Sequence, residues 1–325
     1  RHDTLQLVAA ELVQEPARDG DGAVADPVAG GESVECVGVQ HHHLGHRHAR
    51  RDRDLLDHVV ELRRIGLVDL PGASHGQHHL VADRERYAAD PAFSPVPVAG
   101  LLAPAYLKQR AAQINLKADN QHITAGVPEG AVPLGEAKAL EYANTSHLSV
   151  VDKDGNAVSM TTSIENVFGS GLMVGGFLLN NQLTDFSLSP QKQGYLVANR
   201  VEAGKRPRSS MAPMMVFNAD GSLKLLTGSP GGSRIINYVG QSIVAILDWK
   251  LDVQQALNLP RLTHRNDYLA LEKGTALAAQ QAILEDMGYK VQLQDLNSGI
   301  HAIMLTKQGL QGAADPRREG SVAAH

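Results

Sequence analysis

The chain has 325 residues, of which 43% are hydrophobic, and its formal net charge at pH 7 is −5. This length and apolar content suffice for one large domain or two smaller ones, and the mildly acidic balance favours neither nucleic acid nor an anionic membrane as a partner. No apolar run is long enough to predict a membrane span, and the single Cys36 excludes an internal disulfide bond. Residues 1–16 lack the apolar middle of a signal peptide, so the sequence leaves the localisation open.

Residues 1–79 differ in composition from the rest of the chain. They hold ten of the fifteen His but no Phe, Tyr, Trp, Met, Lys or Asn. Because large side chains are needed to build a core, we expect this atypical segment to be poorly ordered. The missing residue types have codons rich in A or T. We therefore hypothesise that the segment is GC-rich DNA read in a non-native frame, with the genuine frame beginning near Leu80.

A cluster of histidines lies inside this segment, between Gln40 and His48. Imidazoles suit zinc, copper or nickel. No Cys, Asp or Glu accompanies the histidines at a defined spacing, so the cluster is typical of an adventitious tract rather than a metal site. The sequence predicts neither a metal nor an organic cofactor.

From Leu80 the pattern becomes helical, with Leu80, Arg84 and Tyr87 on one face, and it stops at Asp90–Pro91. A second helix is predicted within residues 96–114. Residues 115–140 are rich in Gly, Pro, Ala and Glu and predict a flexible linker.

A β-hairpin is predicted next, because residues 145–152 and 156–164 both alternate between polar and apolar side chains. Asp154–Gly155 is typical of a two-residue type I′ turn. This turn would place Thr145 opposite Ile164, with Ser163 beside it. The hairpin therefore brings two hydroxyl groups together at its open end.

Thr145 is the candidate nucleophile. A threonine hydroxyl needs a neighbouring base before it can attack a carbonyl, and no Ser/His/Asp spacing supplies one. The remaining base is the threonine's own α-amine, whose pKa is roughly 8 when it is a chain terminus. This chemistry requires cleavage between Asn144 and Thr145.

The remaining elements predict an α+β fold with two sheets between helix layers. Residues 177–179 predict a buried strand that ends in amides and an acid, which either bind an ammonium group or cap the next turn. Ser209 and Ser210 either bind a ligand or form a plain serine turn before a strand at 214–217. Further strands are predicted at 223–227, 290–293 and 300–306, with helices at 235–248, 253–258 and 276–287.

The glycine-rich loop 228–234 lies between a strand and a helix, so its backbone N–H groups can face an anion. A phosphate-binding loop would require Lys and Ser or Thr after the glycines, and these are absent. An oxyanion hole made by the amides of Gly231 and Gly232 is the better interpretation, at roughly 3 kcal/mol per donor.

Separated blocks of this sequence resemble the γ-glutamyltransferases, also called glutathione hydrolases. The blocks occur in the family's order and at close to its spacing: 145–152, 155–159, 168–171, 179–186, 205–211, 227–234 and 314–318. They cover the family's small subunit. Asp83–Tyr87 and Asp90–Pro91 resemble the last helices of its large subunit. The resemblance divides the chain into the atypical segment 1–79, a large-subunit end with the cleavage linker at 80–144, and a catalytic region at 145–325.

This resemblance implies the four-layer αββα sandwich of N-terminal-nucleophile hydrolases, with an incomplete large subunit. It implies that Glu165, Gln182 and Asp185 hold the α-amino group of a γ-glutamyl substrate and that Ser209 and Ser210 hold its α-carboxylate. Glutathione or a related compound would donate the acyl group, and water, an amino acid or a peptide would accept it. The large and small subunits would both derive from this chain by self-cleavage.

Two alternatives stay open. A related acylase that cleaves a glutaryl or other side-chain amide would use the same threonine. A non-enzymatic remnant is the second alternative, because most of the family's large subunit precedes the cleavage point and supplies an arginine for the substrate carboxylate. Residues 1–79 offer no stretch that matches it.

Overall fold

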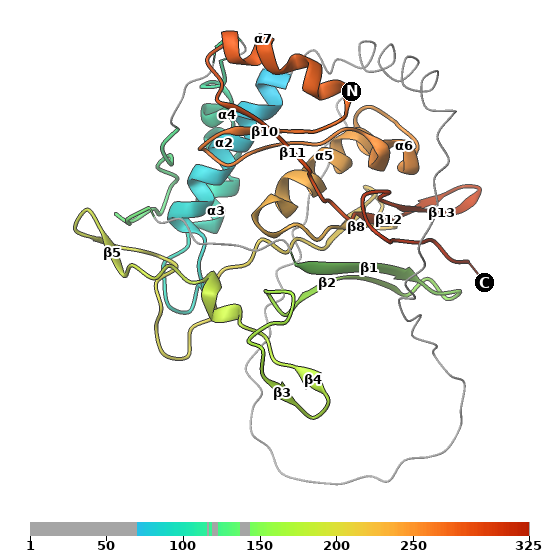
Figure 1. The fold of residues 1–325 in the computed structure, drawn as a ribbon, viewed down its shortest axis with the longest axis horizontal. Coiled ribbons are helices and arrows are strands. Elements are labelled where there is room, and N and C mark those ends of the chain that lie inside the picture. Colours follow the sequence, from blue (N-terminus) through green and yellow to red (C-terminus); the bar gives the residue numbers. More distant parts are fainter. Residues whose placement is uncertain (1–69, 116, 119–122, 137–143, 325) are drawn as a thin grey trace.

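The computed structural model describes residues 70–115, 117–118, 123–136 and 144–324 (Figure 1). The histidine cluster and most of the atypical segment lie outside these residues. The first described helix, α2 (Leu70–Tyr87), runs across the boundary predicted between residues 79 and 80. It ends just before Asp90, as the helical spacing predicts.

Two stacked sheets form the centre of the molecule (Figure 1). The larger sheet is antiparallel, with strand order β13-β12-β8-β7. Its strands are β7 (Met214–Phe217), β8 (Leu223–Gly228), β12 (His301–Thr306) and β13 (Gly309–Ala314). The hairpin of β1 (Thr145–Val151) and β2 (Ala157–Ser163) packs against β8 and β12. The predicted nucleophile thus begins a strand that lies on a second sheet.

Two helices cover the opposite face of the larger sheet, α5 (Ile235–Leu247) and α6 (Val253–Asn258). The apolar side of α5 meets the sheet in one core cluster, in which Tyr238 and Leu225 are fully buried. Burial of each large aliphatic or aromatic side chain contributes about 1.5–3 kcal/mol. Asp252 caps α6 with a capping box: its carboxylate accepts from the Gln255 amide, and the Gln255 side chain accepts from the Asp252 amide.

The α+β class is confirmed, and three of the four predicted layers are described: one of helices and two of strands. The outer face of β1 and β2 carries four exposed apolar side chains, Leu148, Val150, Val158 and Met160. Within the described ranges, no helix lies on this face (Figure 1). The fourth layer therefore stays a prediction.

A smaller sheet lies beside this sandwich, with strand order β11-β10-β9. Its strands are β9 (Leu262–His264), β10 (Leu269–Glu272) and β11 (Val291–Gln294). The helices η4 (Ala276–Gln280) and α7 (Gln281–Asp286) pack on β10 and β11, and α2 packs on β9. After α2 the chain forms two short helices that pack on each other, α3 (Val98–Leu102) and α4 (Pro104–Ala111). The sequence did not predict β9 or β10. The assignment of 290–293 to one of only two sheets was therefore wrong, because β11 pairs with β10.

The register of the β1–β2 hairpin differs by one residue from the prediction. Thr145 pairs with Ser163, not with Ile164. The loop has three residues, 153–155, because the Asp152 carboxylate accepts the amides of Asp154 and Asn156, both at 2.8 Å. Gly155 closes this loop at φ +85°, the usual bulge position. The change places the Thr145 and Ser163 hydroxyl groups directly opposite each other.

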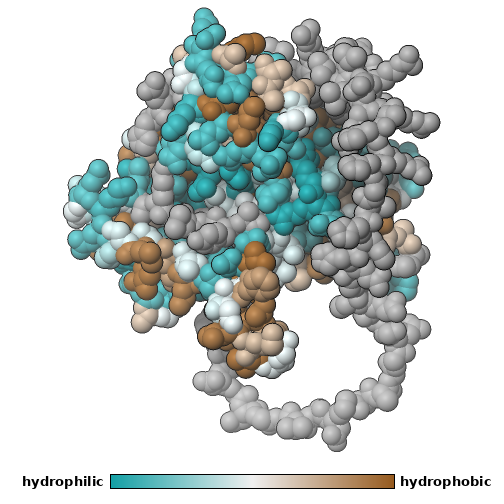
Figure 2. Space-filling view, in the orientation of Figure 1, coloured by the Kyte–Doolittle hydropathy of each residue, from teal (hydrophilic) through white to brown (hydrophobic). Residues whose placement is uncertain are grey.

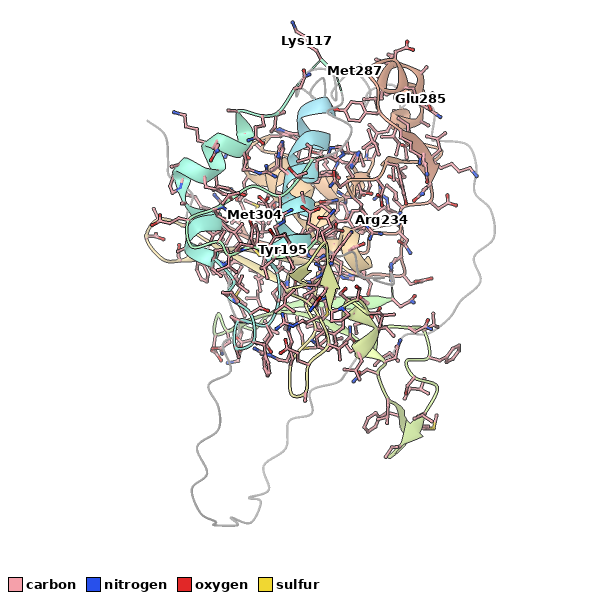
Figure 3. The ribbon with its side chains drawn as sticks, turned by 90° about the vertical axis from the view of Figure 1, so that its left-hand side faces the viewer. Lys117, Tyr195, Arg234, Glu285, Met287 and Met304 are labelled. Atoms are coloured by element: carbon pink, nitrogen blue, oxygen red, sulfur yellow. The ribbon has the colours of Figure 1, made fainter. Side chains whose placement is uncertain are left out.

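A short hairpin of β3 (Met173–Val174) and β4 (Phe177–Leu178) stands away from the body (Figures 1 and 3). Its apolar side chains form the brown patch low in Figure 2, and Phe177 is 63% exposed. The prediction of a buried strand at 177–179 was therefore wrong. The strand is only two residues long, and its one described partner strand is β3.

The stretch 123–136 is irregular, as predicted for the linker, but part of it is packed. Ile123, Ala125 and Leu134 are buried, and Gly135 forms a bridge with Val197. Beyond it, the hairpin of β5 (Gln191–Lys192) and β6 (Tyr195–Leu196) projects toward the viewer in Figure 3, where Tyr195 is labelled. No helix in the described part of the chain is long and apolar enough to cross a membrane.

Candidate active site

A narrow pocket of about 20 Å³ opens at the end of the β1–β2 hairpin. Eight of the nine residues predicted for catalysis or substrate binding line it, together with Met211 and Ile235. These eight are Thr145, Ser163, Glu165, Gln182, Asp185, Ser209, Ser210 and Gly232. The ninth, Gly231, is adjacent in sequence but does not line the pocket. Residues from five separate segments thus converge on the predicted nucleophile.

The Ser163 side chain links Thr145 to the predicted cleavage point. The Thr145 hydroxyl donates to Ser163 Oγ at 3.5 Å, and the Ser163 hydroxyl donates to the Asn144 carbonyl at 2.9 Å. The amide of Glu165 also donates to Ser163 Oγ, at 2.9 Å. Ser163 is therefore fixed by its neighbours, with its hydroxyl on the carbonyl of the predicted cleavage point.

Two buried acids form one wall of the pocket. The Gln182 side-chain amide donates to Glu165 Oε2 at 3.2 Å and to Asp185 Oδ2 at 2.6 Å. Gln182 and Asp185 belong to the 3₁₀ helix η2 (Gln182–Asp185), and Asn199 holds this helix through the Asp185 carbonyl at 2.7 Å. Glu165 has φ +73°, a strained conformation for a residue other than glycine. This wall of the pocket therefore carries two carboxylates.

The facing wall holds Ser209 and Ser210. The Arg84 guanidinium, from α2, donates to Ser210 Oγ at 2.6 Å. Ser210 Oγ therefore accepts a charge-assisted hydrogen bond. Sequence analysis did not assign Arg84 to the site. Its signal was the Asp83–Tyr87 block, but nothing in the sequence places that helix beside Ser210.

The glycine loop lies at the start of α5. Gly231 has φ +137° and Gly232 has φ +58°, and a Cβ at Gly231 would lie 2.7 Å from the Tyr238 ring. Both the backbone conformation and the space therefore require glycine at 231. Among the described residues, no acceptor is found for either amide N–H. Arg234, labelled in Figure 3, closes the short turn η3 (Gly232–Arg234) and donates to Gln294 at 2.5 Å.

His147 lies between the two stacked sheets, two residues after Thr145 in β1. Its ring nitrogens contact Thr161 Oγ1 at 2.8 Å and Ser149 Oγ at 3.1 Å. A Cβ at Gly228 would lie 2.2 Å from the ring, so Gly228 provides the space for it. The ring thus fixes the nucleophile strand over β8, whose last residue begins the glycine loop. Sequence analysis missed this role because the contact joins distant segments.

Stability is expected to fall in mild acid because of His147. Burial, and to a smaller extent the nearby His301, lowers the pKa of His147 to about 4 from 6.5. Between these values the unfolded chain binds more protons than the folded one. The contribution of neutral His147 to the free energy of unfolding is therefore fully present above about pH 6.5. It is lost as the pH falls toward 4, and the loss amounts to about 3 kcal/mol. Urea unfolding measured from pH 4 to pH 7.5 checks this slope.

His147→Gln keeps a hydrogen-bonding side chain but does not titrate, so it should flatten that slope. His301, whose pKa burial also lowers, remains in the variant and leaves a smaller slope. An unchanged slope in His147→Gln would contradict the assignment.

No cluster of metal ligands is found at the site: the described residues contain no group of three or more His, Cys, Asp and Glu that would hold an ion.

The sequence profile of one family, Gamma-glutamyltranspeptidase, matches residues 75–325. This chain belongs to the γ-glutamyltranspeptidase family.

Curated relatives agree with this membership. The chain is 34% identical to the glutathione hydrolase proenzyme of Escherichia coli strain K12 over 342 aligned residues, which cover 98% of this chain and 57% of that protein. It is 41% identical to the glutathione hydrolase proenzyme of Pseudomonas aeruginosa over 257 residues, or 75% of this chain and 44% of that one. The chain therefore spans about half the length of these relatives. The first alignment also reaches into residues 1–79, where the sequence alone offered no match.

A solved structure supports the fold class. The cephalosporin acylase of Bacillus halodurans matches 78% of this γ-glutamyltranspeptidase-family chain and 44% of its own, with a TM-score of 0.63 and 26% identity. The αββα arrangement predicted for N-terminal-nucleophile hydrolases is consistent with the three layers described above.

Proposed function

We propose that this chain carries the catalytic part of a γ-glutamyltransferase and glutathione hydrolase that uses Thr145 as its nucleophile. The observation that supports this function is the convergence of eight sequence-predicted residues on one pocket around Thr145. The pocket has acids on one side and serines on the other. The acids match the α-ammonium group of a γ-glutamyl compound, and the serines match its α-carboxylate.

Cleavage between Asn144 and Thr145 would free the α-amine that activates the threonine. Thr145 Oγ attacks the γ-carbonyl carbon of the donor, and the α-amine takes the hydroxyl proton and delivers it to the departing amine. The products are a γ-glutamyl ester on Thr145 and, from glutathione, cysteinylglycine. Water then hydrolyses the ester, or an amino acid or peptide accepts the acyl group. The amides of Gly231 and Gly232 would stabilise the tetrahedral oxyanion.

Substrate orientation would follow from the two walls of the pocket. Glu165, Gln182 and Asp185 would hold the α-ammonium group, and the Gln182 amide that now donates to both acids would shift to admit it. Ser209 and Ser210 would bind the α-carboxylate, next to the Arg84 guanidinium that donates to Ser210 Oγ. A substrate with both groups would therefore bind in one orientation, with its γ-carbonyl at Thr145.

The chain spans only part of its relatives, so the assembly is also part of the proposal. Self-cleavage would yield one piece that ends at Asn144 and one that begins at Thr145. Assays should therefore compare the chain alone with the chain co-expressed with the N-terminal part of the P. aeruginosa relative that it does not cover. If the chain is active only when it is co-expressed with this part, it is the catalytic part of a larger assembly. If it is inactive both alone and in co-expression, the remnant alternative holds.

A side-chain amide acylase is the second candidate, which the match to a cephalosporin acylase favours. γ-Glutamyl and glutaryl p-nitroanilides separate the two activities, because glutaryl lacks the α-ammonium group that Glu165 and Asp185 would bind. We expect faster turnover of the γ-glutamyl anilide, and Asp185→Asn should lower kcat/KM for this substrate alone. Faster turnover of the glutaryl anilide would instead assign the acylase activity.

Replacement of both serines, Ser209→Ala with Ser210→Ala, is expected to raise KM for a γ-glutamyl anilide by about tenfold or more. Hydrogen bonds to a charged group contribute about 1.5–3 kcal/mol, and here they act on the ground state as well as the transition state. The kcat should change much less than KM. Ser222→Ala, in an exposed turn, is the matched control, and an unchanged KM in the double variant would remove the serines from the carboxylate site.

A further inference from the structure

The loop that precedes β12 lies against the glycine loop. β8 ends at Gly228 and β12 begins at His301, and these two residues are cross-strand partners in the larger sheet (Figure 1). Since the two strands are antiparallel, the residues that follow Gly228 and those that precede His301 leave the sheet at the same end. A Cβ at Gly299 would lie 2.7 Å from Pro230 Cγ. The two loops are therefore packed so closely that position 299 has no space for a side chain.

Ser229 joins the two loops by hydrogen bonds, and its side chain is fully buried. Its Oγ accepts the Gly299 amide at 3.4 Å, and its hydroxyl donates to the Pro230 carbonyl at 2.7 Å. This carbonyl belongs to the same planar peptide unit as the Gly231 amide, so a bond that holds the carbonyl also fixes the direction of the Gly231 N–H. The Pro230 ring already fixes φ of residue 230 and leaves ψ as the torsion that turns this peptide unit. The Ser229 hydroxyl restrains that torsion.

The segment that carries Gly299 is itself held by Asp315. The Ser298 hydroxyl donates to Oδ2 of Asp315 at 2.5 Å, and the Asp315 amide donates to the Ile300 carbonyl at 2.8 Å. These bonds act on the residues on both sides of Gly299. The Gly299 amide is therefore kept at Ser229 by a buried carboxylate outside the pocket.

We propose that Ser229 is a positioning residue for the oxyanion hole, which orients and polarises the Gly231 amide toward the carbonyl that reacts with Thr145. The inference rests on the proposed function, because that function assigns the Gly231 amide to the tetrahedral oxyanion. A hydrogen bond to a peptide oxygen makes the N–H of the same peptide a better donor, which is the cooperative effect of hydrogen-bonded chains. Here the chain runs from the Gly299 N–H through the Ser229 hydroxyl to the peptide before Gly231. An oriented donor acts mainly in the transition state, where the negative charge develops.

Selective isotope labelling isolates the Gly231 amide for a direct test by NMR. The sequence has two Pro–Gly pairs, at residues 71–72 and 230–231. Labelling of proline carbonyls with ¹³C and of glycine nitrogens with ¹⁵N therefore gives two correlation signals in the full chain, and Gly72, in α2, is the internal reference. Ser229→Ala should shift the Gly231 signal and leave the Gly72 signal in place. Ser242→Ala removes an equally buried hydroxyl, which donates to carbonyls of its own helix α5, and should move neither signal.

Turnover of a γ-glutamyl anilide tests the consequence for catalysis, with the full chain alone or co-expressed with the N-terminal part of the P. aeruginosa relative. Ser229→Ala should lower kcat about tenfold and change KM by less than about twofold. Complete loss of an oxyanion donor costs about 10²–10³-fold in kcat, and here the donor is kept but is no longer oriented. Gly299→Ala retains the hydroxyl but displaces Pro230, so it should also lower kcat. Gly240→Ala, which adds a Cβ in open space on α5, is its matched control and should retain kcat.

The two measurements separate the positioning role from general damage. An unmoved Gly231 signal in Ser229→Ala overturns the proposal, and so does an unchanged kcat. A KM that rises as much as kcat falls would indicate damage to the whole pocket and overturns it as well. If the Gly231 signal shifts but no form of the wild-type chain turns over a γ-glutamyl donor, the proposed function fails while the Ser229 bond to the loop stands. If the wild-type chain is active and Ser229→Ala matches it, the positioning role fails alone.

Discussion

Thr145→Ala is expected to leave the chain intact between Asn144 and Thr145 and to abolish turnover of γ-glutamyl substrates. The hydroxyl is the attacking group in both reactions, and no described side chain is placed to replace it. For the wild-type chain, intact mass spectrometry should show two fragments, one ending at Asn144 and one beginning at Thr145. In Thr145→Ala, turnover of a γ-glutamyl substrate should fall to the limit of detection.

Self-cleavage has a geometric basis in the described site. Oγ of Thr145 belongs to the residue that follows the Asn144 carbonyl, so an N-to-O acyl shift followed by ester hydrolysis is available. The Ser163 hydroxyl donates to that carbonyl at 2.9 Å and accepts from Thr145. Ser163→Ala should therefore slow cleavage, whereas Ser163→Thr keeps the donor and should preserve it.

Thr145→Ser is the matched control, since it keeps both the hydroxyl and the amine and should still be cut. A wild-type chain that stays whole and yet turns over a γ-glutamyl donor would contradict the mechanism. A chain that stays whole and inert, and that complementation with the N-terminal part of a relative does not rescue, would favour the remnant alternative.

The residues that line the pocket could be singled out from the sequence because they belong to short motifs. The alternation around Thr145, the amides and the acid of residues 180–185, the paired serines and the strand–glycine–helix sequence each identify a residue type and a local geometry. The structure brings eight of these residues to one pocket. The sequence could order these motifs along the chain but could not show that they meet. That step came from the resemblance to a family.

The errors of the sequence-based prediction have a common physical origin: they involve contacts that the alternation of polar and apolar residues along the chain does not show. The hairpin register depended on the Asp152 carboxylate, which binds two loop amides and lengthens the turn by one residue. The contact of Arg84 with Ser210 spans 126 positions, and His147 fits a space left by Gly228. Strands β9 and β10 were missed because they are short and buried, and so lack a period-two pattern.

Asp315→Ala is expected to destabilise the fold by about 3–5 kcal/mol. Asp315 is buried and lies 3.5 Å from Nη2 of Arg261, a fully buried guanidinium. It also accepts the Ser298 hydroxyl at 2.5 Å and binds Arg317 at 2.9 Å. Burial lowers the pKa of Arg261 to about 10, so this residue remains charged at neutral pH. Removal of the carboxylate leaves an uncompensated buried charge, which is among the most costly single changes in a protein.

Chemical denaturation checks this value, and a double variant identifies its cause. Arg261→Met with Asp315→Leu removes both charges and replaces them with apolar side chains of similar size, so it should recover most of the lost stability. Arg317 retains Glu272 as its partner at 2.6 Å in both variants and is therefore not a source of the difference. If the double variant is as unstable as Asp315→Ala, the loss comes from the bonds to Ser298 and the backbone rather than from the stranded charge. Because Asp315 precedes Arg317 and Arg318 by only two and three residues, the same ion pair also holds the C-terminal segment that brings Arg318 to Thr145.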